Sequence, residues 1–393
     1  MSGRELRFGH ALRPLWHLEE GARFLNHGSF GACPREVLAE QDRIRLEVEA
    51  QPDVFFRQSI VPGDAPTRLR EAAGQLAHFV GASADSLAFV ENATAGTQAV
   101  LRSMAFKAGD EILVTDHTYN AVRLMVEARC AETGAAVRVV ELALPASAEG
   151  IVEAFRAALT PRVRLAIVDH ITSPTALVLP LERIVPGLRR FGARVLVDGA
   201  HAVGQVPLDM PALGADWYVS NAHKWLFAPK GTAFLYASRD AAGITAPLVV
   251  SHFVALGFPR AFDYVGTRDY TAWLAVPAAL RFFESLDVKE SARHRSGLID
   301  HATRLFAGLG ASPAGADDLC GAMRSFVLPT RRAVTAEEAE SLMRTLWRDH
   351  RIQVMSTAFA GRLLLRVSAQ VYVERTDLDA LASALARNGW PAR

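Results

Sequence analysis

The chain has 393 residues, of which 50% are hydrophobic and 22% are charged, and its 43 basic and 42 acidic residues give a formal net charge of +1. This length suits two domains that share a core, and the intermixed charges argue against a nucleic-acid or membrane partner. No stretch approaches the ~20 apolar residues that a membrane span needs.

The three cysteines, Cys33, Cys130 and Cys320, are too few and too scattered for a disulfide framework or a zinc site. The first 21 residues carry charges and lack a continuous apolar core, which is unlike a secretory signal. We therefore expect a cytoplasmic protein without a metal centre.

Along the chain, an N-terminal arm at 1–20 is followed by helical periodicity at 34–51 and 67–80. Short apolar runs then occur at 87–90, 111–116, 137–143, 164–170, 194–200, 217–222 and 232–237. The helices between these runs begin near Ala93, Tyr119, Ser147 and Leu181. Such alternation predicts an α/β fold with a mostly parallel seven-stranded sheet, whose active site lies at the carboxyl ends of the strands.

From about Thr271 the pattern changes to two long helices, then to strand-like runs interleaved with helices at 335–350 and 376–388. The runs are SFVLP, IQVMS and LLLRVS. We therefore expect a large domain at 21–270 and a smaller α+β domain at 271–393, against which the N-terminal helical segment can pack.

The strongest chemical signal joins Asp198, in RVLVDGAHAVGQ, to Lys224, 26 residues later in DWYVSNAHKWLFAPKGTAFLY. A pyridoxal-5′-phosphate (PLP) enzyme needs such a pair. The lysine amine forms a Schiff base with the cofactor, and the carboxylate keeps the pyridine nitrogen protonated. A lone Asp at a strand end is more often a helix cap, but a His three residues on and a later His-Lys pair favour the cofactor. The only other lysines are Lys107, Lys230 and Lys289.

The motifs VDGAHAVGQ, SNAHKW and PKGTAFLY resemble the fold-type I, class V aminotransferase superfamily of PLP-dependent enzymes. FLNHGSFGACP, SNAHKW and VGTRD are most similar to its isopenicillin N epimerase group. The resemblance spans residues 23 to about 380. It implies PLP as the cofactor, Lys224 as its covalent anchor and Asp198 as the partner of the ring nitrogen.

A phosphate site is expected where the run 87–90 leads through ENAT into a helix, because free N–H groups at a helix start attract anions. Plain capping by Asn92 is the alternative, and the two are compatible. The resemblance implies phosphate contacts from Ala93, Thr94 and His223, with weaker candidates at Asn221 and Ser220.

The family also places an aromatic or imidazole ring on the pyridine face. Tyr119, in TDHTYNAV, matches that position better than His117, although a buried structural tyrosine is the alternative. His201 is expected beside the ring's phenolic oxygen as an N–H donor, with a core histidine as its alternative. We therefore name Lys224, Asp198, His201 and Tyr119 as candidate catalytic residues.

Arg366, in LLLRVSAQVY, matches the arginine that holds the substrate α-carboxylate in similar enzymes. A planar guanidinium suits a carboxylate bidentately, and the alternative is an ion pair within the small domain. Ser173 is a candidate cofactor neighbour, and Asn26 a candidate substrate neighbour.

Thr267, in VGTRD, matches a phosphate contact that the family takes from the neighbouring subunit. The resemblance thus implies a homodimer with its active site at the interface. Arg268 and Asp269 of the same loop are candidates for an ion pair with each other. The segment 52–66 is expected at the site entrance, where Phe55, Phe56 and Arg57 would select substrate unless the two Phe belong to the core or an interface.

Cysteine desulfurases need a nucleophilic cysteine shortly before the carboxylate-binding arginine, and RIQVMSTAFAGRLLLR contains none. We therefore reject a persulfide mechanism and expect an amino-acid substrate whose α-proton passes to the Lys224 amine. The resemblance favours an epimerase. A carbon–sulfur β-lyase on a cysteine conjugate or sulfoxide, and an aminotransferase, remain open. A non-enzymatic relative would be expected to lack Lys224 or Asp198.

Overall fold

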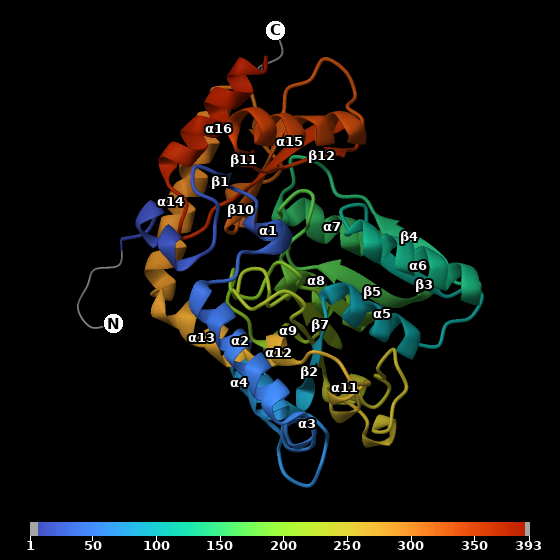
Figure 1. Ribbon diagram of the computed structural model, residues 1–393. Coiled ribbons are helices and arrows are strands. Elements are labelled where there is room, and N and C mark those ends of the chain that lie inside the picture. The colour runs from blue at the N-terminus through green and yellow to red at the C-terminus, as the bar shows by residue number, and fades with distance from the viewer. Residues whose placement is uncertain (1–6, 390–393) are drawn as a thin grey trace.

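The computed structural model describes residues 7–389, and its centre is a seven-stranded sheet in the order β2-β8-β7-β6-β5-β3-β4 (Figure 1). The strands are β2 Leu87–Val90, β3 Glu111–Thr115, β4 Ala136–Val140, β5 Val163–Asp169, β6 Arg194–Asp198, β7 Trp217–Ser220 and β8 Ala233–Ala237. β8 is antiparallel to both its neighbours, and the other neighbouring strands are parallel. The expected mostly parallel α/β sheet is therefore confirmed.

Helices cover both faces of this sheet, which explains why its strands are continuous apolar runs. One face packs against α5 (Ala93–Ser103) and α6 (Asn120–Thr133), in the same buried cluster as Leu196 of β6. The other face packs against α7 (Ala148–Ala158) and α8 (Leu181–Arg190), in the cluster that holds Val197.

A group of three N-terminal helices lies beside the main sheet. It packs against two helices that come after the last strand of that sheet in the sequence (Figure 1). Its members are α2 Arg35–Ala50, α3 Pro52–Ser59 and α4 Arg68–Phe79, and their partners are α12 Thr271–Leu274 and α13 Val276–Ser285. Shorter elements are η1 His10–Leu15, α1 His27–Phe30, η2 Ala84–Ser86, α9 Met210–Leu213, α10 Arg239–Ala242, η3 Val254–Leu256, α11 Arg260–Asp263 and η4 Asp317–Leu319. Within residues 7–389, no helix combines the length and the apolar character that crossing a bilayer requires.

The C-terminal part forms a smaller sheet in the order β12-β13-β10-β9, with three long helices. Its elements are β9 Ser312–Pro313, β10 Met323–Leu328, β11 Ile352–Gln353, β12 Met355–Phe359, β13 Arg362–Ser368, α14 Val288–Ala307, α15 Ala336–His350 and α16 Arg375–Arg387. β1 (Arg23–Phe24) pairs in parallel with β11, outside this sheet. The Ser368 N–H also donates to the Leu25 carbonyl at 2.8 Å. These contacts hold the N-terminal segment against the end of β13.

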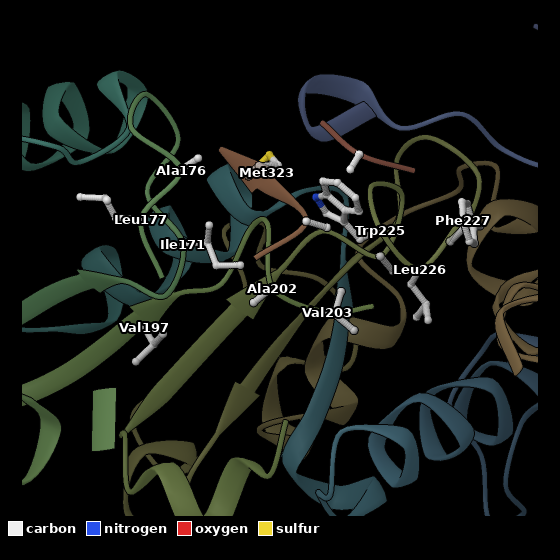
Figure 2. Close-up of a cluster of buried hydrophobic side chains, with 14 of the residues drawn as sticks. Ile171, Ala176, Leu177, Val197, Ala202, Val203, Trp225, Leu226, Phe227 and Met323 are labelled. Atoms are coloured by element: carbon white, nitrogen blue, oxygen red, sulfur yellow. The ribbon is translucent and has the colours of Figure 1, made fainter. Parts of the chain in front are cut away.

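The residues after Lys224 anchor its loop in the core. Trp225, Leu226 and Phe227 are all nearly fully buried, and Figure 2 shows Trp225 in the apolar cluster that also includes Val203 and Met323. Gly204 has a φ of +80°, and a Cβ there would lie 2.4 Å from the Trp225 carbonyl oxygen. The loop that follows β6 therefore packs directly on the backbone beside Lys224, which only glycine permits.

Candidate active site

Three of the expected catalytic side chains meet at the carboxyl edge of the sheet. Asp198 is the last residue of β6, and its Oδ1 accepts a hydrogen bond from the Ala200 N–H at 3.0 Å. Lys224 follows β7, and its Nζ lies 3.3 Å from the His201 Nε2. Parallel strands end at the same edge, so residues distant in sequence come together here.

Burial controls the protonation of these groups. Loss of water lowers the pKa of Lys224 to about 7, with the Arg366 charge acting in the same direction and Asp198 opposing it. Burial also holds the pKa of His201 well below its usual value, helped by Lys224 and Arg366. The site therefore offers a substantially uncharged amine near neutral pH, which is the nucleophilic form of lysine.

His27 ties Lys224 to the rest of the molecule, and its role was not predicted from the sequence. It is fully buried, with Nδ1 2.7 Å from the Tyr372 hydroxyl and Nε2 2.9 Å from the Lys224 carbonyl oxygen. Burial lowers its pKa to about 3, so the imidazole is neutral. Its Nε2–H must donate to the carbonyl, which leaves Nδ1 to accept from Tyr372.

At the expected phosphate site, the start of α5 is already partly engaged. The Asn221 Oδ1 accepts from the Ala93 N–H at 2.8 Å, and the Asn92 Oδ1 caps the helix through Ala95 N–H, also at 2.8 Å. Helix geometry leaves the Thr94 N–H without an intrahelical partner. Capping by Asn92 thus coexists with a free N–H at Thr94.

His223 lies beside Lys224 with a fixed ring orientation. Its Nδ1 lies 3.0 Å from the Thr232 carbonyl oxygen, which makes Nδ1 the protonated nitrogen and leaves Nε2 available. Burial, with the Lys224 charge, lowers its pKa to about 4. Ser220 points elsewhere, because its hydroxyl donates to the Gly199 carbonyl and supports the loop after β6.

The two ring candidates in the loop after β3 differ in their freedom. The His117 Nδ1 lies 2.8 Å from the Thr175 hydroxyl, and its fully buried ring packs edge-on against Phe359 at 4.6 Å. Tyr119 precedes α6 and is 48% exposed. The Tyr119 ring is therefore free to cover a ligand, whereas His117 is committed to packing.

Arg366 presents a buried guanidinium to the N-terminal segment and to the loop after β5. Nη1 donates to the Ser173 carbonyl oxygen at 2.6 Å, and Nη2 to the Ser29 hydroxyl at 2.8 Å and the Asn26 Oδ1 at 3.3 Å. The side chain is only 2% exposed, and burial lowers its pKa to about 10. No carboxylate within residues 7–389 pairs with it, so the geometry does not support the small-domain ion pair. Ser29 was missed because it is close only in three dimensions.

The VGTRD loop borders the start of α5 through Arg268, while Thr267 makes no described contact with the other site residues. Thr267 is exposed, and its hydroxyl contacts only Tyr264, at 3.2 Å, among the described side chains. The expected ion pair between Arg268 and Asp269 is wrong: Arg268 pairs with Glu91, and Asp269 lies 3.7 Å from Arg45. Each of the two side chains therefore has a partner that is distant in sequence.

The phenylalanine pair of α3 belongs to the packing of the N-terminal helices. Phe55 is 6% exposed and lies under the Arg68 guanidinium, 5.2 Å from ring centroid to carbon. Phe56 packs edge-on against Tyr270 at 6.0 Å, and Arg57 is exposed and pairs within α3. The core alternative therefore describes this pair better than the substrate entrance.

The arrangement fits PLP on its own geometry. Within the described part of the chain, it combines a buried amine, a carboxyl group at a strand end, a helix N–H without a partner and a guanidinium without a carboxylate partner. The buried His201 Nδ1 also lacks a hydrogen-bond partner among the described residues, as expected for an atom that hydrogen-bonds a ligand.

Comparisons with known proteins agree with this fit. The family model for aminotransferase class-V matches residues 34–312. A putative L-cysteine desulfhydrase 1 from Oryza sativa subsp. japonica is 35% identical over 93% of this chain and 78% of its own length. The isopenicillin N epimerase of Amycolatopsis lactamdurans is 33% identical over 94% of this chain and 95% of its own.

Solved structures show the same fold. The apo cysteine desulfurase of Thermococcus onnurineus NA1 has a TM-score of 0.80 at 17% identity, with 98% of each chain covered. A cystine C–S lyase in complex with cysteine persulfide has a TM-score of 0.78 at 24% identity, covering 93% of this chain and 98% of its own. The chain belongs to the class V aminotransferase family of fold-type I, PLP-dependent enzymes.

Proposed function

We propose that this enzyme is a carbon–sulfur lyase that removes the α-proton of a cysteine-type amino acid and releases its β-sulfur substituent. The observation that carries the proposal is a buried site that holds a desolvated amine, Lys224, and a guanidinium, Arg366, that has no carboxylate partner within residues 7–389. Three relatives at 33–35% identity, two named putative and one named probable L-cysteine desulfhydrase, support this reaction class.

Nine residues of this chain would contact the cofactor. Lys224 would bind it covalently, Asp198 would hold a proton on the ring nitrogen, and Tyr119 would cover the ring. Thr94 and His223 would contact the phosphate, and Ala93 and Asn221 would line the pocket around the phosphate. His201 would donate to the phenolic oxygen, and Ser173 would border it. When bound, PLP supplies an electron sink for negative charge at the substrate α-carbon.

Arg366 and Lys224 would divide the work on the substrate. Arg366 would hold the α-carboxylate through its planar fork, which Ser29, Asn26 and Ser173 keep oriented. The Lys224 Nζ, once free, would take the α-proton, and its pKa of about 7 suits a general base near neutral pH. The same ammonium could then return a proton to the departing sulfur.

An epimerase is the second candidate, because relatives named isopenicillin N epimerase are 31–33% identical. Epimerisation needs a proton donor on the face opposite Lys224, and the exposed Tyr119 hydroxyl is the candidate for that donor. Elimination needs no second donor, and we therefore rank it first.

The cysteines offer little support for a persulfide reaction. Burial raises the pKa of Cys33 to about 12, that of Cys320 to about 11, and that of Cys130 above its usual value. A protonated thiol is a poor nucleophile.

Product analysis tests the reaction. We expect incubation in deuterated water with L-amino acids, D-amino acids and cysteine S-conjugates to yield pyruvate, ammonia and a thiol from the conjugates, measured by mass spectrometry. Lys224→Ala should abolish the formation of these products, and Lys230→Ala should retain it. Inverted amino acid carrying deuterium would instead establish the epimerase, and a keto acid with pyridoxamine phosphate would establish an aminotransferase.

Arg366→Ala tests the substrate carboxylate contact. Losing a desolvated bidentate contact of about 2–5 kcal/mol predicts a fall in kcat/KM of roughly 30- to several-thousand-fold. Arg366→Lys should recover only part, since an ammonium lacks the planar fork. The melting temperature should also fall, because the hydrogen bonds to Ser173, Ser29 and Asn26 are lost, so kcat/KM is compared on the folded protein.

Arg324→Ala is the matched control, as Arg324 is buried on the neighbouring β10 and pairs with Asp317. It should lower the melting temperature and leave kcat/KM of the folded protein nearly unchanged. An Arg366→Ala protein with lowered melting temperature and intact kinetics would overturn the assignment.

We also propose a homodimer that completes each site with Thr267 of the second copy. Residues 241–259 contain no Asp, Glu, Lys or Arg. Six of their apolar side chains are exposed: Ile244, Leu248, Val249, Val250, Val254 and Leu256. A contiguous exposed apolar patch of this kind is typical of a protein–protein interface. The Phe253 ring lies 6.0 Å from that of Tyr264, which contacts Thr267, so the patch is continuous with the VGTRD loop.

Mixing variants tests this interface. Lys224→Ala and Thr267→Ala should each lose activity, and their mixture should regain some, because a hybrid dimer contains one intact site. Light scattering should show a dimer that Val250→Asp splits, whereas Leu124→Asp, on the exposed side of α6, should not. A fully active monomer would end the proposal.

A further inference from the structure

A second buried carboxyl group lies beside Asp198. Asp169 is the last residue of β5, and it pairs in parallel register with Asp198 of β6. In-register residues on neighbouring strands point to the same face about 4.8 Å apart. The two side chains are only 3% and 5% exposed. Two carboxyl groups therefore lie side by side at the carboxyl edge of the sheet, where both are shielded from water.

Little around Asp169 would neutralise a second charge. The Thr118 hydroxyl donates to its Oδ2 at a long 3.4 Å. On the β3 side, Asp116 and His117 lie 3.7 Å apart and bond the Leu142 backbone instead. No cation within residues 7–389 forms an ion pair with Asp169, and the Lys224 charge acts on Asp198.

Two like charges in such a place repel each other and lose their hydration, so one of them takes up a proton. Burial and the Asp198 charge both raise the pKa of Asp169 well above its usual range. We propose that Asp169 is a positioning residue that shares one proton with Asp198, so that the pair presents a single negative charge to the cofactor's ring nitrogen.

The shared proton would give Asp198 a fixed orientation, because the Asp169 hydroxyl can donate to it. Thr118 directly precedes Tyr119, so the same contact would also position the residue proposed to cover the ring. This inference rests on the proposed function, in which Asp198 is the partner of the ring nitrogen.

Infrared spectroscopy of the cofactor-free protein labelled with carbon-13 aspartate tests the proton directly. At about pH 8, well above the ordinary pKa of Asp, we expect a protonated carboxyl signal in the wild type that is absent from Asp169→Asn. Asp263→Asn is the matched control. Burial raises the pKa of Asp263 to about 6, so Asp263 is already ionised at this pH and its removal should leave the signal unchanged.

Thr118→Val provides a test that does not require Asp169→Asn to fold. The hydroxyl favours the charged form of Asp169, so its removal should make the signal persist to higher pH than in the wild type. A wild type without the signal, a signal that survives in Asp169→Asn, or a titration unmoved by Thr118→Val would overturn the shared proton. None of these results would affect cofactor attachment or product identity, so failure here is distinguishable from failure of the proposed function.

Discussion

The exclusion of water from Lys224 is the constraint on which the site depends. An amine in water would be fully protonated at neutral pH, and a charged amine neither attacks a carbonyl group nor removes a proton. Burial, with the Arg366 charge acting in the same direction, brings the pKa of Lys224 to about 7. The fold must therefore keep this lysine dry while leaving a path for the substrate.

Three distant segments cooperate to achieve this. His27, from the N-terminal segment, bonds the Lys224 carbonyl and Tyr372 of the C-terminal part. The pairing of β1 with β11 holds that segment in place and brings Ser29 to the Arg366 guanidinium. The N-terminal segment thus contacts both Lys224 and Arg366, and a movement of this segment would act on both residues at once.

The sequence was informative where local pattern determines structure. Apolar runs identified all seven strands of the main sheet, and the Asp198 and Lys224 motifs marked the strand ends that converge. Asn26, Ser173 and Arg366, which meet across the fold, were named from the family resemblance, whereas other residues whose roles depend on distant contacts were missed. The local sequence HGSFG does not indicate that His27 bonds both Lys224 and Tyr372. The importance of Asp169 follows only from its register with Asp198 in the sheet. The VGTRD loop shows the opposite error, because adjacent opposite charges suggested a pair where each residue has a distant partner.

Reductive trapping shows directly whether Lys224 is the covalent anchor of PLP. Borohydride reduction of the PLP-loaded protein, followed by proteolysis and peptide mass spectrometry, should place the added pyridoxyl mass on Lys224. Lys230 is the control, because it lies six residues later and its ammonium bonds the Gly31 carbonyl at 2.7 Å. An adduct on Lys230, or one that persists in Lys224→Ala, would contradict the account.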